Sequence, residues 1–471
     1  MRSMVWFRGK DLRVADHAPL REAAESGDVI PVFVVDPYFF APERAAGASH
    51  RMQFLVESLE SLAANLGHLG SRLILVRGRS TEVIPRLAER WRVDQVLAHR
   101  WTEPFGRERD ERVATALGQV PFRRFEGETL FEPGTVRTGQ GGMFKVFTPF
   151  GRVCGARAAG LPMPAPRSLP PLPPDLAELG EALPTLAELG LVRNPGLQAG
   201  GEREGRARLK AFLPRLERYH EGRDQLGVEG TSRLSADLKF GTLSIRTVWA
   251  AVAAEAPGEG RRRYLSELLW REFSHHLLWT WPHLLHAPFR PEWEHFPYED
   301  QPEHWAAWAE GRTGFPVIDA AARELLATGY VHNRARMIAA SFLTKHLLLD
   351  WRKGEAHYLR YLTDGDWAQN SLGWQWSAGC GVDAQPWFRI FNPVTQGKRF
   401  DADGAYVRRW VPELAGLPPS QIHEPWKVDA TRRRSLDYPE PIVDLSEGRA
   451  RFLAVAKRYL GGPADAAETE D

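Results

Sequence analysis

The sequence predicts two folds in succession: a Rossmann-like α/β domain built on a five-stranded parallel sheet, and an all-α domain beyond it. Three observations lead to this fold class. Short apolar runs alternate with helical patterns through the first 128 residues, a proline-rich stretch follows, and after residue 201 apolar residues recur at three- and four-residue spacing. We therefore expect an α/β domain at 1–128, an interdomain linker at 129–201 and a helical domain at 202–471.

Five short and mostly apolar segments predict the strands, at 3–7, 29–36, 72–76, 95–98 and 122–126. Helical patterns lie between them, at 50–65, 81–91 and 107–117. Because strands and helices alternate, we expect right-handed crossovers and a parallel sheet buried on both faces. The first strand leads into residues 8–13, Arg-Gly-Lys-Asp-Leu-Arg, and not into Gly-x-Gly-x-x-Gly, which argues against a dinucleotide in the usual crevice.

The remainder of the chain follows the same division. Seven prolines between residues 162 and 174 indicate a stiff connector laid over the surface. Beyond it, helices are predicted at 206–219, 263–281, 317–327, 333–351 and 355–363. The acidic tail after Gly461 is predicted to be frayed.

Composition limits the class of protein. With 43% apolar and 26% charged residues the chain is predicted to be soluble and globular, and with 61 basic against 60 acidic residues any nucleic acid must meet a local basic patch. Cys154 and Cys380 are too few for a disulfide framework and indicate a reducing compartment. Because the sequence has no signal-peptide pattern and no run of 18 apolar residues, we expect a cytoplasmic protein of the bacterial type, away from membranes. We also expect it to be a monomer.

The stretch 364–376 has the most unusual composition in the chain. It holds two carboxylates, Asp364 and Asp366, together with Asn370 and three Trp. Asp and Asn disfavour helix interiors and Trp offers a large apolar face, so this stretch is suited to the wall of a polar-aromatic pocket. Alternatively it is a helix-loop-helix corner whose Trp side chains pack and whose Asp side chains cap. Fourteen of the 17 Trp lie after residue 248, which favours an aromatic ligand in this half.

An anion site is suggested where Thr231, Ser232, Arg233 and Ser235 lie at a predicted helix start. Free N–H groups and the helix dipole attract negative charge there, and hydroxyls add donors. An ordinary N-cap has the same composition, so this alternative stays open.

Two helical faces carry charge beside an aromatic or apolar residue. Glu267, Trp270 and Arg271 share one face and could hold a nucleobase or flavin; alternatively, Trp270 is core and Arg271 pairs with a carboxylate. Arg334 and Arg336 point about 200° apart on the next helix, so one can face a partner while the other pairs inward.

Basic and aromatic residues mix again at 387–389 and 396–399, in the manner of nucleic-acid surfaces. The sequence has no Cys/His spacing typical of a metal site and no nucleophile elbow. We therefore predict no metal.

Several of these motifs occur together, and in the same order, in one family. Through residues 6–13, 231–235, 267–273, 364–366 and 373–376 the chain resembles the photolyase/cryptochrome family over essentially its full length, and within it the class I cyclobutane pyrimidine dimer (CPD) photolyases. The resemblance implies FAD in the helical domain and an antenna chromophore in the α/β domain.

The resemblance also implies roles for individual residues. The residues implied to hold FAD are Tyr219, Thr231, Ser232, Arg233, Leu234, Ser235, Arg271, Arg336, Asp364, Gly365, Asp366 and Asn370. The residues implied to be catalytic are Glu267, Trp270, Asn333, Met337, Asn370 and Trp376. The residues implied to contact DNA are Arg223, Glu267, Trp270, Arg271, Asn333, Arg334, Trp376, Arg389, Gln396 and Lys398.

The implied activity is the light-driven repair of CPDs in UV-damaged DNA, by electron transfer from photoexcited reduced FAD to a flipped-out dimer. The alternative is a cryptochrome-type blue-light photoreceptor without repair activity. Plant-type cryptochromes resemble this chain but carry Asp in place of Asn370 and lack Met337 and Trp376, and an amide cannot feed a proton to the flavin. A light-independent flavoprotein would not need the residues of a lesion pocket.

The resemblance also bears on the choice of lesion and on the choice of antenna chromophore. Enzymes for the (6-4) photoproduct place a His pair within the motif that reads His-Asn-Arg-Ala-Arg-Met at 332–337 here, so we expect CPDs. Folate-binding relatives carry Asn-Glu where this chain has Glu-Pro-Phe-Gly-Arg at 103–107, so a deazaflavin or FMN is favoured over folate. An empty antenna site is the alternative.

Electrons are implied to reach the flavin through Trp374, Trp351 and Tyr298, the last of which stands where relatives have Trp. An oxidised Tyr normally loses its phenolic proton, so Tyr298 needs an acceptor such as solvent or the carboxylates that follow it, Glu299 and Asp300. The alternative outer donors are Trp293, Trp305 and Trp308.

Overall fold

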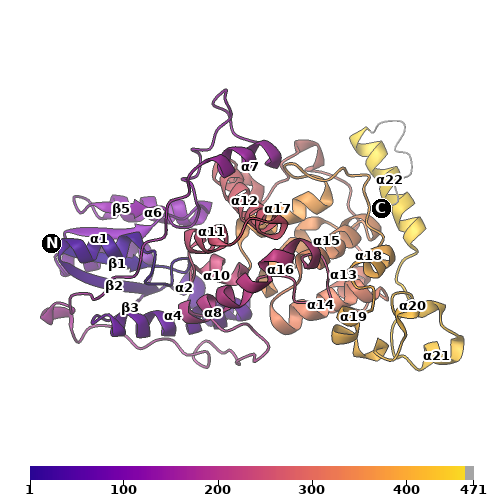
Figure 1. Cartoon of the computed structure of the whole chain (residues 1–471), viewed down its shortest axis with the longest axis horizontal. Coiled ribbons are helices and arrows are strands. Elements are labelled where there is room, and N and C mark those ends of the chain that lie inside the picture. The colour runs from indigo at the N-terminus through magenta and orange to yellow at the C-terminus, as the bar shows by residue number, and fades with distance from the viewer. Residues whose placement is uncertain (462–471) are drawn as a thin grey trace. The chain divides into compact units, whose positions relative to one another are not determined.

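A computed structural model describes residues 1–461 (Figure 1). Internal contacts divide the chain into two compact units: unit 1 comprises Met1–Glu217 and Ser232–Pro282, and unit 2 comprises Arg218–Thr231 and the chain from His283 onward. The predicted domain boundaries at 128 and 201 do not coincide with these units and stay a prediction. The acidic tail after Gly461, predicted to be frayed, lies outside the described residues.

A parallel sheet forms the centre of unit 1, and it has five strands among the described residues. The strands are β1 (Arg2–Phe7), β2 (Asp28–Val35), β3 (Ile74–Arg77), β4 (Gln95–His99) and β5 (Phe122–Phe125). Their order is β3-β2-β1-β4-β5, with every neighbouring pair parallel. The predicted fold class is confirmed. The order reverses beside β1, so the carboxyl ends of β1 and β4 flank the switch point where open α/β sheets bind ligands.

Successive residues of β1 point to opposite faces of the sheet, and both faces are buried. Val5 and Phe7 pack in one core with Leu59, whereas Met4 and Trp6 belong to a second core. The first core is covered by α1 (Ala18–Ser26) and α4 (Ser49–His68), which are labelled in Figure 1. The second is covered by α5 (Ser80–Arg90) and α6 (Pro104–Ala116). The apolar character of the central strands β1, β2 and β4 follows from this double coverage.

The chain from the proline-rich segment to Glu181 is hydrogen-bonded to the end of α4 and to the edge of the sheet. The N–H of Glu181 donates to the carbonyl of Leu75 in the edge strand β3 at 2.9 Å, and the Glu181 carboxylate pairs with Arg77 at 2.6 Å. The N–H of Leu169 donates to Leu69 O at 2.7 Å. The segment therefore occupies backbone groups that an exposed edge strand would offer to another chain.

The other helices of unit 1 are α2 (Pro37–Phe40), α3 (Pro42–Ala46), α7 (Phe147–Ala156), α8 (Glu202–Phe212), α10 (Ser235–Phe240), α11 (Ile245–Ala254) and α12 (Glu259–Thr280). Helix α7 was not expected within the linker. Its apolar positions Phe147, Phe150 and Cys154 have helical spacing, but Pro149 and Gly151 between them conceal the pattern.

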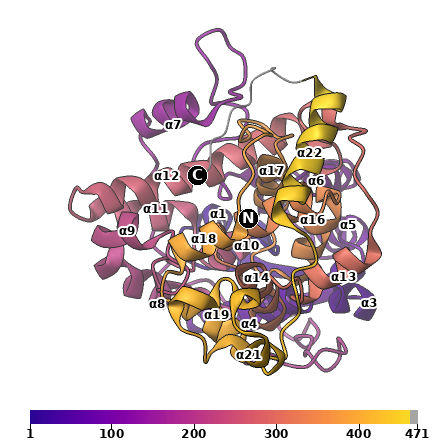
Figure 2. The ribbon, with the colours of Figure 1, turned by 90° about the vertical axis from the view of Figure 1, so that its right-hand side faces the viewer.

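The helices of unit 2 are α9 (Tyr219–Gly222), α13 (Pro302–Glu310), α14 (Pro316–Thr328), α15 (Asn333–Ser341), α16 (Trp351–Tyr361), α17 (Trp367–Ala378), α18 (Pro393–Phe400), α19 (Ala405–Trp410), α20 (Pro419–Ile422), α21 (Ala430–Arg434) and α22 (Leu445–Leu460). Helix α17 packs against α15 and α16, and α22 packs against the turn that follows α15 (Figures 1 and 2). The apolar residues of these helices share one core.

The single helix predicted at 333–351 is wrong. Helix α15 ends at Ser341 and continues as a π-helical turn, Phe342–His346. Leu348 then adopts a left-handed backbone with φ 54°, and the Asp350 carboxylate caps a new helix that begins at Trp351. Trp351 therefore begins α16 and does not end the helix that starts near Asn333. The apolar run through Leu347, Leu348 and Leu349 has no polar break that would reveal this boundary.

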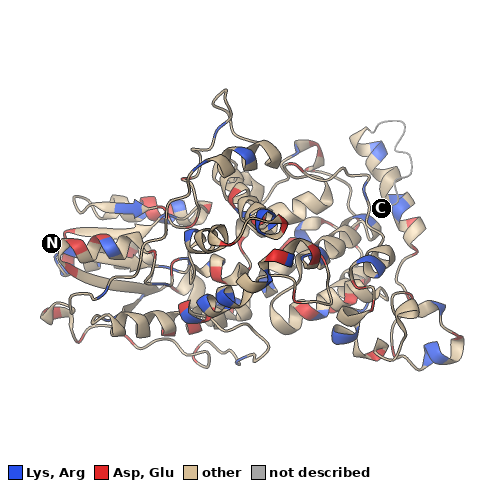
Figure 3. Ribbon diagram, in the orientation of Figure 1, with Lys and Arg blue, Asp and Glu red and all other residues tan. Residues whose placement is uncertain are grey.

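Acidic and basic residues are interspersed along the ribbon of both units (Figure 3), in keeping with the net charge of +1. Within residues 1–461, no helix is both long enough and apolar enough to span a lipid bilayer.

Candidate functional site

The stretch 364–376 forms a turn followed by helix α17. Asp366 is the N-cap residue of this helix, and its Oδ1 accepts hydrogen bonds from the N–H groups of Ala368 at 3.0 Å and Gln369 at 3.1 Å. These bonds satisfy donors that the first turn of a helix cannot pair internally. Asp366 therefore caps a helix, as the alternative interpretation of this stretch predicted, whereas Asp364 pairs with Arg336.

Asp364 is buried and forms an ion pair with the half-buried Arg336 of α15. Arg336 Nη2 lies 3.1 Å from Asp364 Oδ1 and 2.9 Å from Oδ2, and Arg336 Nε donates to Val331 O at 2.7 Å. The Asp364 side chain is only 6% exposed. Burial works against the charged guanidinium, yet the Asp364 carboxylate holds the pKa of Arg336 above its ordinary value. The pair is therefore a fixed set of charged hydrogen-bonding groups.

Asn370 is held by Glu355, on the neighbouring helix α16. The Asn370 amide nitrogen donates to Glu355 O at 2.9 Å and to Glu355 Oε1 at 3.1 Å, and Asn370 is 8% exposed. Burial raises the pKa of Glu355 to about 7, and the hydrogen bond from Asn370 partly opposes this rise. Because the protein occupies the amide nitrogen, the Asn370 carbonyl oxygen points to the opposite side.

Asn333 and Met337 lie one turn apart on α15. The Asn333 amide nitrogen is 3.7 Å from Met337 Sδ, and Asn333 is exposed whereas Met337 is half-buried. His332 precedes them as the N-cap of α15, with its Nδ1 accepting from Arg334 N at 3.1 Å. Its Nε2 is buried and has no hydrogen-bond partner among the described residues. Together these residues offer a polar and thioether surface at the start of α15.

Arg334 and Arg336 diverge as their spacing predicts. Arg334 Nη2 lies 3.1 Å from Asp224 Oδ1, in a pair whose side chains are 18% and 33% exposed. Arg223 also approaches Asp224, at 3.8 Å, and its guanidinium lies 5.6 Å from the ring centre of buried Tyr219. Two predicted DNA contacts thus share one carboxylate, which a phosphate would have to replace.

The hydroxyls at 231–235 do not cap a helix. Helix α10 begins at Ser235 with Leu234 as its N-cap residue, and no side chain accepts from its first N–H groups. In unit 1, Ser232 Oγ accepts from Tyr264 Oη at 2.9 Å and Arg233 has φ 56°; in unit 2, Thr231 Oγ1 lies 3.3 Å from Tyr330 Oη. The N-cap alternative is therefore wrong, and the turn retains hydroxyls and N–H groups of the kind that bind anions.

Helix α12 carries Glu267, Trp270 and Arg271. Glu267 Oε1 lies 3.5 Å from Arg263 Nε, and Arg271 Nη1 donates to the carbonyl oxygen of Glu128 at 2.8 Å. Trp270 is half-buried. Arg271 thus bonds a backbone carbonyl, and the Trp270 ring lies at least partly at the surface.

The predicted DNA contacts near the C-terminus differ in exposure. Lys398 forms an ion pair with Glu424, and the Arg389 carbonyl oxygen accepts from Lys345 Nζ at 2.7 Å. Gln396 is only 3% exposed, and its Oε1 has no hydrogen-bond partner among the described residues. Gln396 therefore lies inside unit 2 in this structure.

This geometry can be compared with known proteins. A family model described as the FAD binding domain of DNA photolyase matches residues 264–458, and a model described as DNA photolyase matches residues 3–170. The deoxyribodipyrimidine photo-lyase of Streptomyces griseus is 42% identical over 94% of this chain and 96% of its own length.

The chain belongs to the DNA photolyase family.

Two solved structures of photolyase and cryptochrome share its fold. A bacterial class III photolyase from Agrobacterium tumefaciens superposes with a TM-score of 0.89 at 35% identity, covering 98% of both chains. A cryptochrome of Synechocystis sp. PCC6803 superposes with a TM-score of 0.89 at 29% identity, covering 96% of this chain and 99% of its own. The predicted likeness to class I within the DNA photolyases stays a prediction.

The side chains of unit 2 fit the flavin that DNA photolyases bind. The Arg336–Asp364 pair presents donors and an acceptor to a polar heteroaromatic edge, and Asn370 contributes an amide oxygen. Thr363 Oγ1 is buried beside them in the chain and has no hydrogen-bond partner among the described residues. A ligand with a hydrogen-bonding group at this place could therefore pair with the Thr363 hydroxyl.

The predicted electron relay can be traced within unit 2. Trp374 is 4% exposed, Trp351 is 1% exposed and Tyr298 is half-buried. A Cβ on Gly354 would overlap the Trp374 ring, so glycine at this position lets α16 approach α17. Burial, with Cys380 and Asp350 nearby, raises the pKa of Tyr298 well above its usual value. A phenolate is thus strongly disfavoured at Tyr298.

Ring contacts lead from Trp374 to residues other than the predicted ones. The Trp374 ring centre lies 6.0 Å from Trp308 and 5.2 Å from Tyr358. Trp305 is half-buried and stacks on Trp308 at 5.5 Å. Two of the alternative donors therefore form a continuous aromatic contact with Trp374, and only the three-dimensional structure reveals it.

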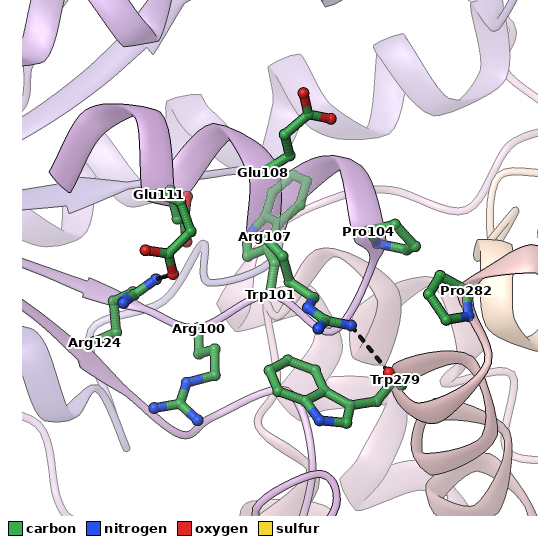
Figure 4. Close-up of a pocket in the computed structure, with 10 residues that line it drawn as sticks. Arg100, Trp101, Pro104, Arg107, Glu108, Glu111, Arg124, Trp279 and Pro282 are labelled. Atoms are coloured by element: carbon green, nitrogen blue, oxygen red, sulfur yellow. Dashed lines mark hydrogen bonds and ion pairs between the residues drawn. The ribbon is translucent and has the colours of Figure 1, made fainter. Parts of the chain in front are cut away.

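A pocket of about 530 Å³ lies in unit 1 (Figure 4). Its lining residues are Arg100, Trp101, Pro104, Arg107, Glu108, Asp110, Glu111, Arg124, Trp279 and Pro282. The Arg107 guanidinium lies 3.9 Å from the Trp279 ring centre and donates to Trp279 O at 3.0 Å. Figure 4 marks this hydrogen bond with a dashed line. The pocket adjoins the start of α6, where the 103–107 segment that bears on the antenna chromophore forms the N-cap and first turn.

Proposed function

We propose that this protein is a deoxyribodipyrimidine photo-lyase that repairs cyclobutane pyrimidine dimers in UV-damaged DNA under blue light. The observation that carries the proposal is the neutral Asn370 amide, fixed by two hydrogen bonds to Glu355 beside the Arg336–Asp364 pair. An amide at this place accepts a hydrogen bond but has no acidic proton to give. This supports repair over cryptochrome-type signalling.

The residues that would hold FAD fall into two sets. In unit 2, Arg336, Asp364 and Asn370 would bind the ring system. In unit 1, Ser232 and Ser235 lie at the uncapped start of α10 and suit the diphosphate. When bound, FAD supplies the one-electron chemistry that opens the dimer.

The chain's own residues would bind and orient the flipped dimer. Trp270 and Trp376 are both half-buried and offer ring faces for stacking, worth roughly 1–3 kcal/mol per base. Glu267 would hydrogen-bond a base edge, and Asn333 and Met337 would line the same lesion. Repair breaks two carbon–carbon bonds of the cyclobutane ring without net oxidation or reduction. The protein's share is therefore to select, orient and exclude water.

Repair of an oligonucleotide with a single CPD under blue light tests the proposal. We expect FAD-loaded protein to restore the two pyrimidines, with no repair in the dark. A protein that binds FAD and responds to light, yet repairs neither CPD nor (6-4) lesions, would instead be a photoreceptor. Repair of (6-4) lesions alone would contradict the proposal that the substrate is the CPD.

The antenna chromophore is a separate proposal. We infer a deazaflavin or FMN in preference to folate, because this chain has Glu-Pro-Phe-Gly-Arg at 103–107, where folate-binding relatives carry Asn-Glu. The chromophore released on denaturation identifies it by absorption and mass. Methenyltetrahydrofolate in the released fraction would contradict this choice.

We further propose that the protein acts in the bacterial cytoplasm as a monomer. The two cysteines, Cys154 and Cys380, are buried and free, as a reducing compartment permits. Sedimentation of the purified chain tests the monomer, and fractionation of the producing cells tests the location.

A further inference from the structure

Phe147 and Trp270 form the closest aromatic stack in unit 1 among the rings for which a pairing is described. Their ring centres are 3.7 Å apart and their planes differ by 11°. Aromatic pairs usually prefer offset or edge-on arrangements with centres 4.5–7 Å apart, so two rings rarely meet this closely without support from their surroundings. The support comes from α7, the helix that Phe147 begins.

Helix α7 is anchored on α12 by a second phenylalanine. Phe150 is 1% exposed, and its ring centre lies 4.9 Å from Phe273 and 5.3 Å from His276. Gly151 lies one turn after Phe147, where a Cβ would come within 3.3 Å of the Phe147 ring. Phe150 thus holds the helix in place, and Gly151 leaves room for the Phe147 ring to lie flat on Trp270.

The stack leaves Trp270 with one ring face covered. Phe273 meets its edge, with ring centres 6.1 Å apart at 71°. Trp270 nevertheless remains half-buried, so part of its ring is still accessible. A base that stacks on Trp270 must therefore use the face opposite Phe147, and the plane of that face is set by Phe147.

We propose that Phe147 is a positioning residue for lesion recognition, which holds the Trp270 ring in the plane needed to stack on a flipped base. The inference rests on the proposed repair function. A free indole turns about two side-chain bonds, and fixing it before binding removes an entropic cost that the ligand would otherwise meet. The gain applies to a stacked lesion and not to undamaged duplex DNA, whose bases stay within the helix.

The charge around α7 suits a nucleic acid. Residues 133–174 contain no Asp or Glu but include Arg137, Lys145, Arg152, Arg157 and Arg167. Lys145, Arg152 and Arg157 are exposed. The segment that carries Phe147 therefore presents no carboxylate that would repel a phosphate.

Dark binding by the FAD-loaded full chain tests the proposal, with a CPD oligonucleotide and its undamaged counterpart as probes. Phe147→Leu removes the ring but keeps an apolar side chain. We expect it to reduce the preference for the CPD oligonucleotide by about 2- to 10-fold, the range of an aromatic pair, and to leave affinity for undamaged DNA unchanged. Phe147→Tyr keeps the ring and should restore the preference.

Phe150→Leu is the matched control, because Phe150 lies on the same helix and packs on α12 without contacting the Trp270 ring in the described pairs. It should lower the melting temperature but keep the preference for damaged DNA. If Phe147→Leu unfolds the chain, Phe147→Met carries the same test. Unchanged preference in Phe147→Leu, or an equal loss in Phe150→Leu, overturns the role of Phe147. A wild-type chain without any preference overturns the proposed function and this inference with it.

Discussion

Tryptophan rings have different neighbours in the two units. In unit 1 Trp270 stacks on Phe147, but three other rings meet guanidinium groups: Arg8 lies 4.9 Å from the ring centre of Trp6, Arg109 4.4 Å from Trp101, and Arg107 3.9 Å from Trp279. In unit 2, Trp374, Trp308 and Trp305 meet one another, at 6.0 and 5.5 Å.

The difference matters for electron transfer. A cation over an indole is attracted to its electron-rich face, so it opposes removal of an electron from that ring. Neutral aromatic neighbours impose no such penalty. The three indoles of unit 1 that meet guanidinium groups are thus suited to holding arginines, whereas those of unit 2 are suited to carrying a positive hole. Trp351 is an exception in unit 2, since Arg352 lies 5.0 Å from its ring centre.

The substitution Trp374→Phe should have the largest effect on electron transfer. Because Trp374 is the ring on α17 from which the aromatic contacts lead, we expect the variant to lose photoreduction of bound FAD altogether. Repair by chemically reduced protein should stay intact. Trp279→Phe is the control from unit 1 and should photoreduce normally. Normal photoreduction in Trp374→Phe would show that the aromatic contacts from Trp374 do not carry the electron.

Asp364→Asn tests how much the buried Asp364 carboxylate stabilises unit 2. The change removes the ionic partner of Arg336, whose side chain is 27% exposed, and losing a charged hydrogen bond of this kind costs about 1.5–3 kcal/mol. We expect a loss of this order in the free energy of unfolding, measured with urea, together with poor retention of FAD. Asp224→Asn breaks the more exposed pair with Arg334 and should cost no more than about 1 kcal/mol. Equal costs would show that burial does not separate the two pairs.

Substitution of the outermost electron donor should lower the yield of photoreduction without abolishing it. The family resemblance favours Tyr298, whereas ring contacts favour Trp305 through Trp308. Tyr298 also has a raised pKa, and Trp351, the station before it, has a cation nearby. We expect Trp305→Phe to lower the yield of the long-lived radical, measured by transient absorption, severalfold more than Tyr298→Phe. The reverse order would restore the path through Trp351.

Glu355 should produce the smallest effect, on stability against pH. Its pKa is about 7 in the folded chain and 4.5 ordinarily, so the folded state holds the proton more tightly. Stability from this group is fully present below pH 4.5 and is lost as pH rises towards 7, by about 1–3 kcal/mol. Urea unfolding between pH 4.5 and 8 measures it. Glu355→Gln should flatten this part of the profile, while a profile identical to wild type would assign the slope to other groups.

Prediction from the sequence succeeded where the signal is local. The strands of unit 1 are short apolar runs bounded by turns, so each could be recognised alone, and alternation with helices implied the parallel sheet. The Arg334 and Arg336 directions followed from helix geometry alone. The prediction of a single helix at 333–351 failed at Leu348 and Asp350, because the neighbouring leucines keep an apolar pattern through the helix boundary.

Motifs and apolar periodicity are properties of neighbouring residues, so the family, the fold class and the residue types at the candidate site could be predicted from the sequence. The tertiary structure alone decided the partners: Asp364 for Arg336, Glu355 for Asn370 and Phe147 for Trp270. These contacts join segments 15 to 123 residues apart. Whether a ring or carboxylate meets its partner depends on how helices pack, and no local pattern encodes that distance.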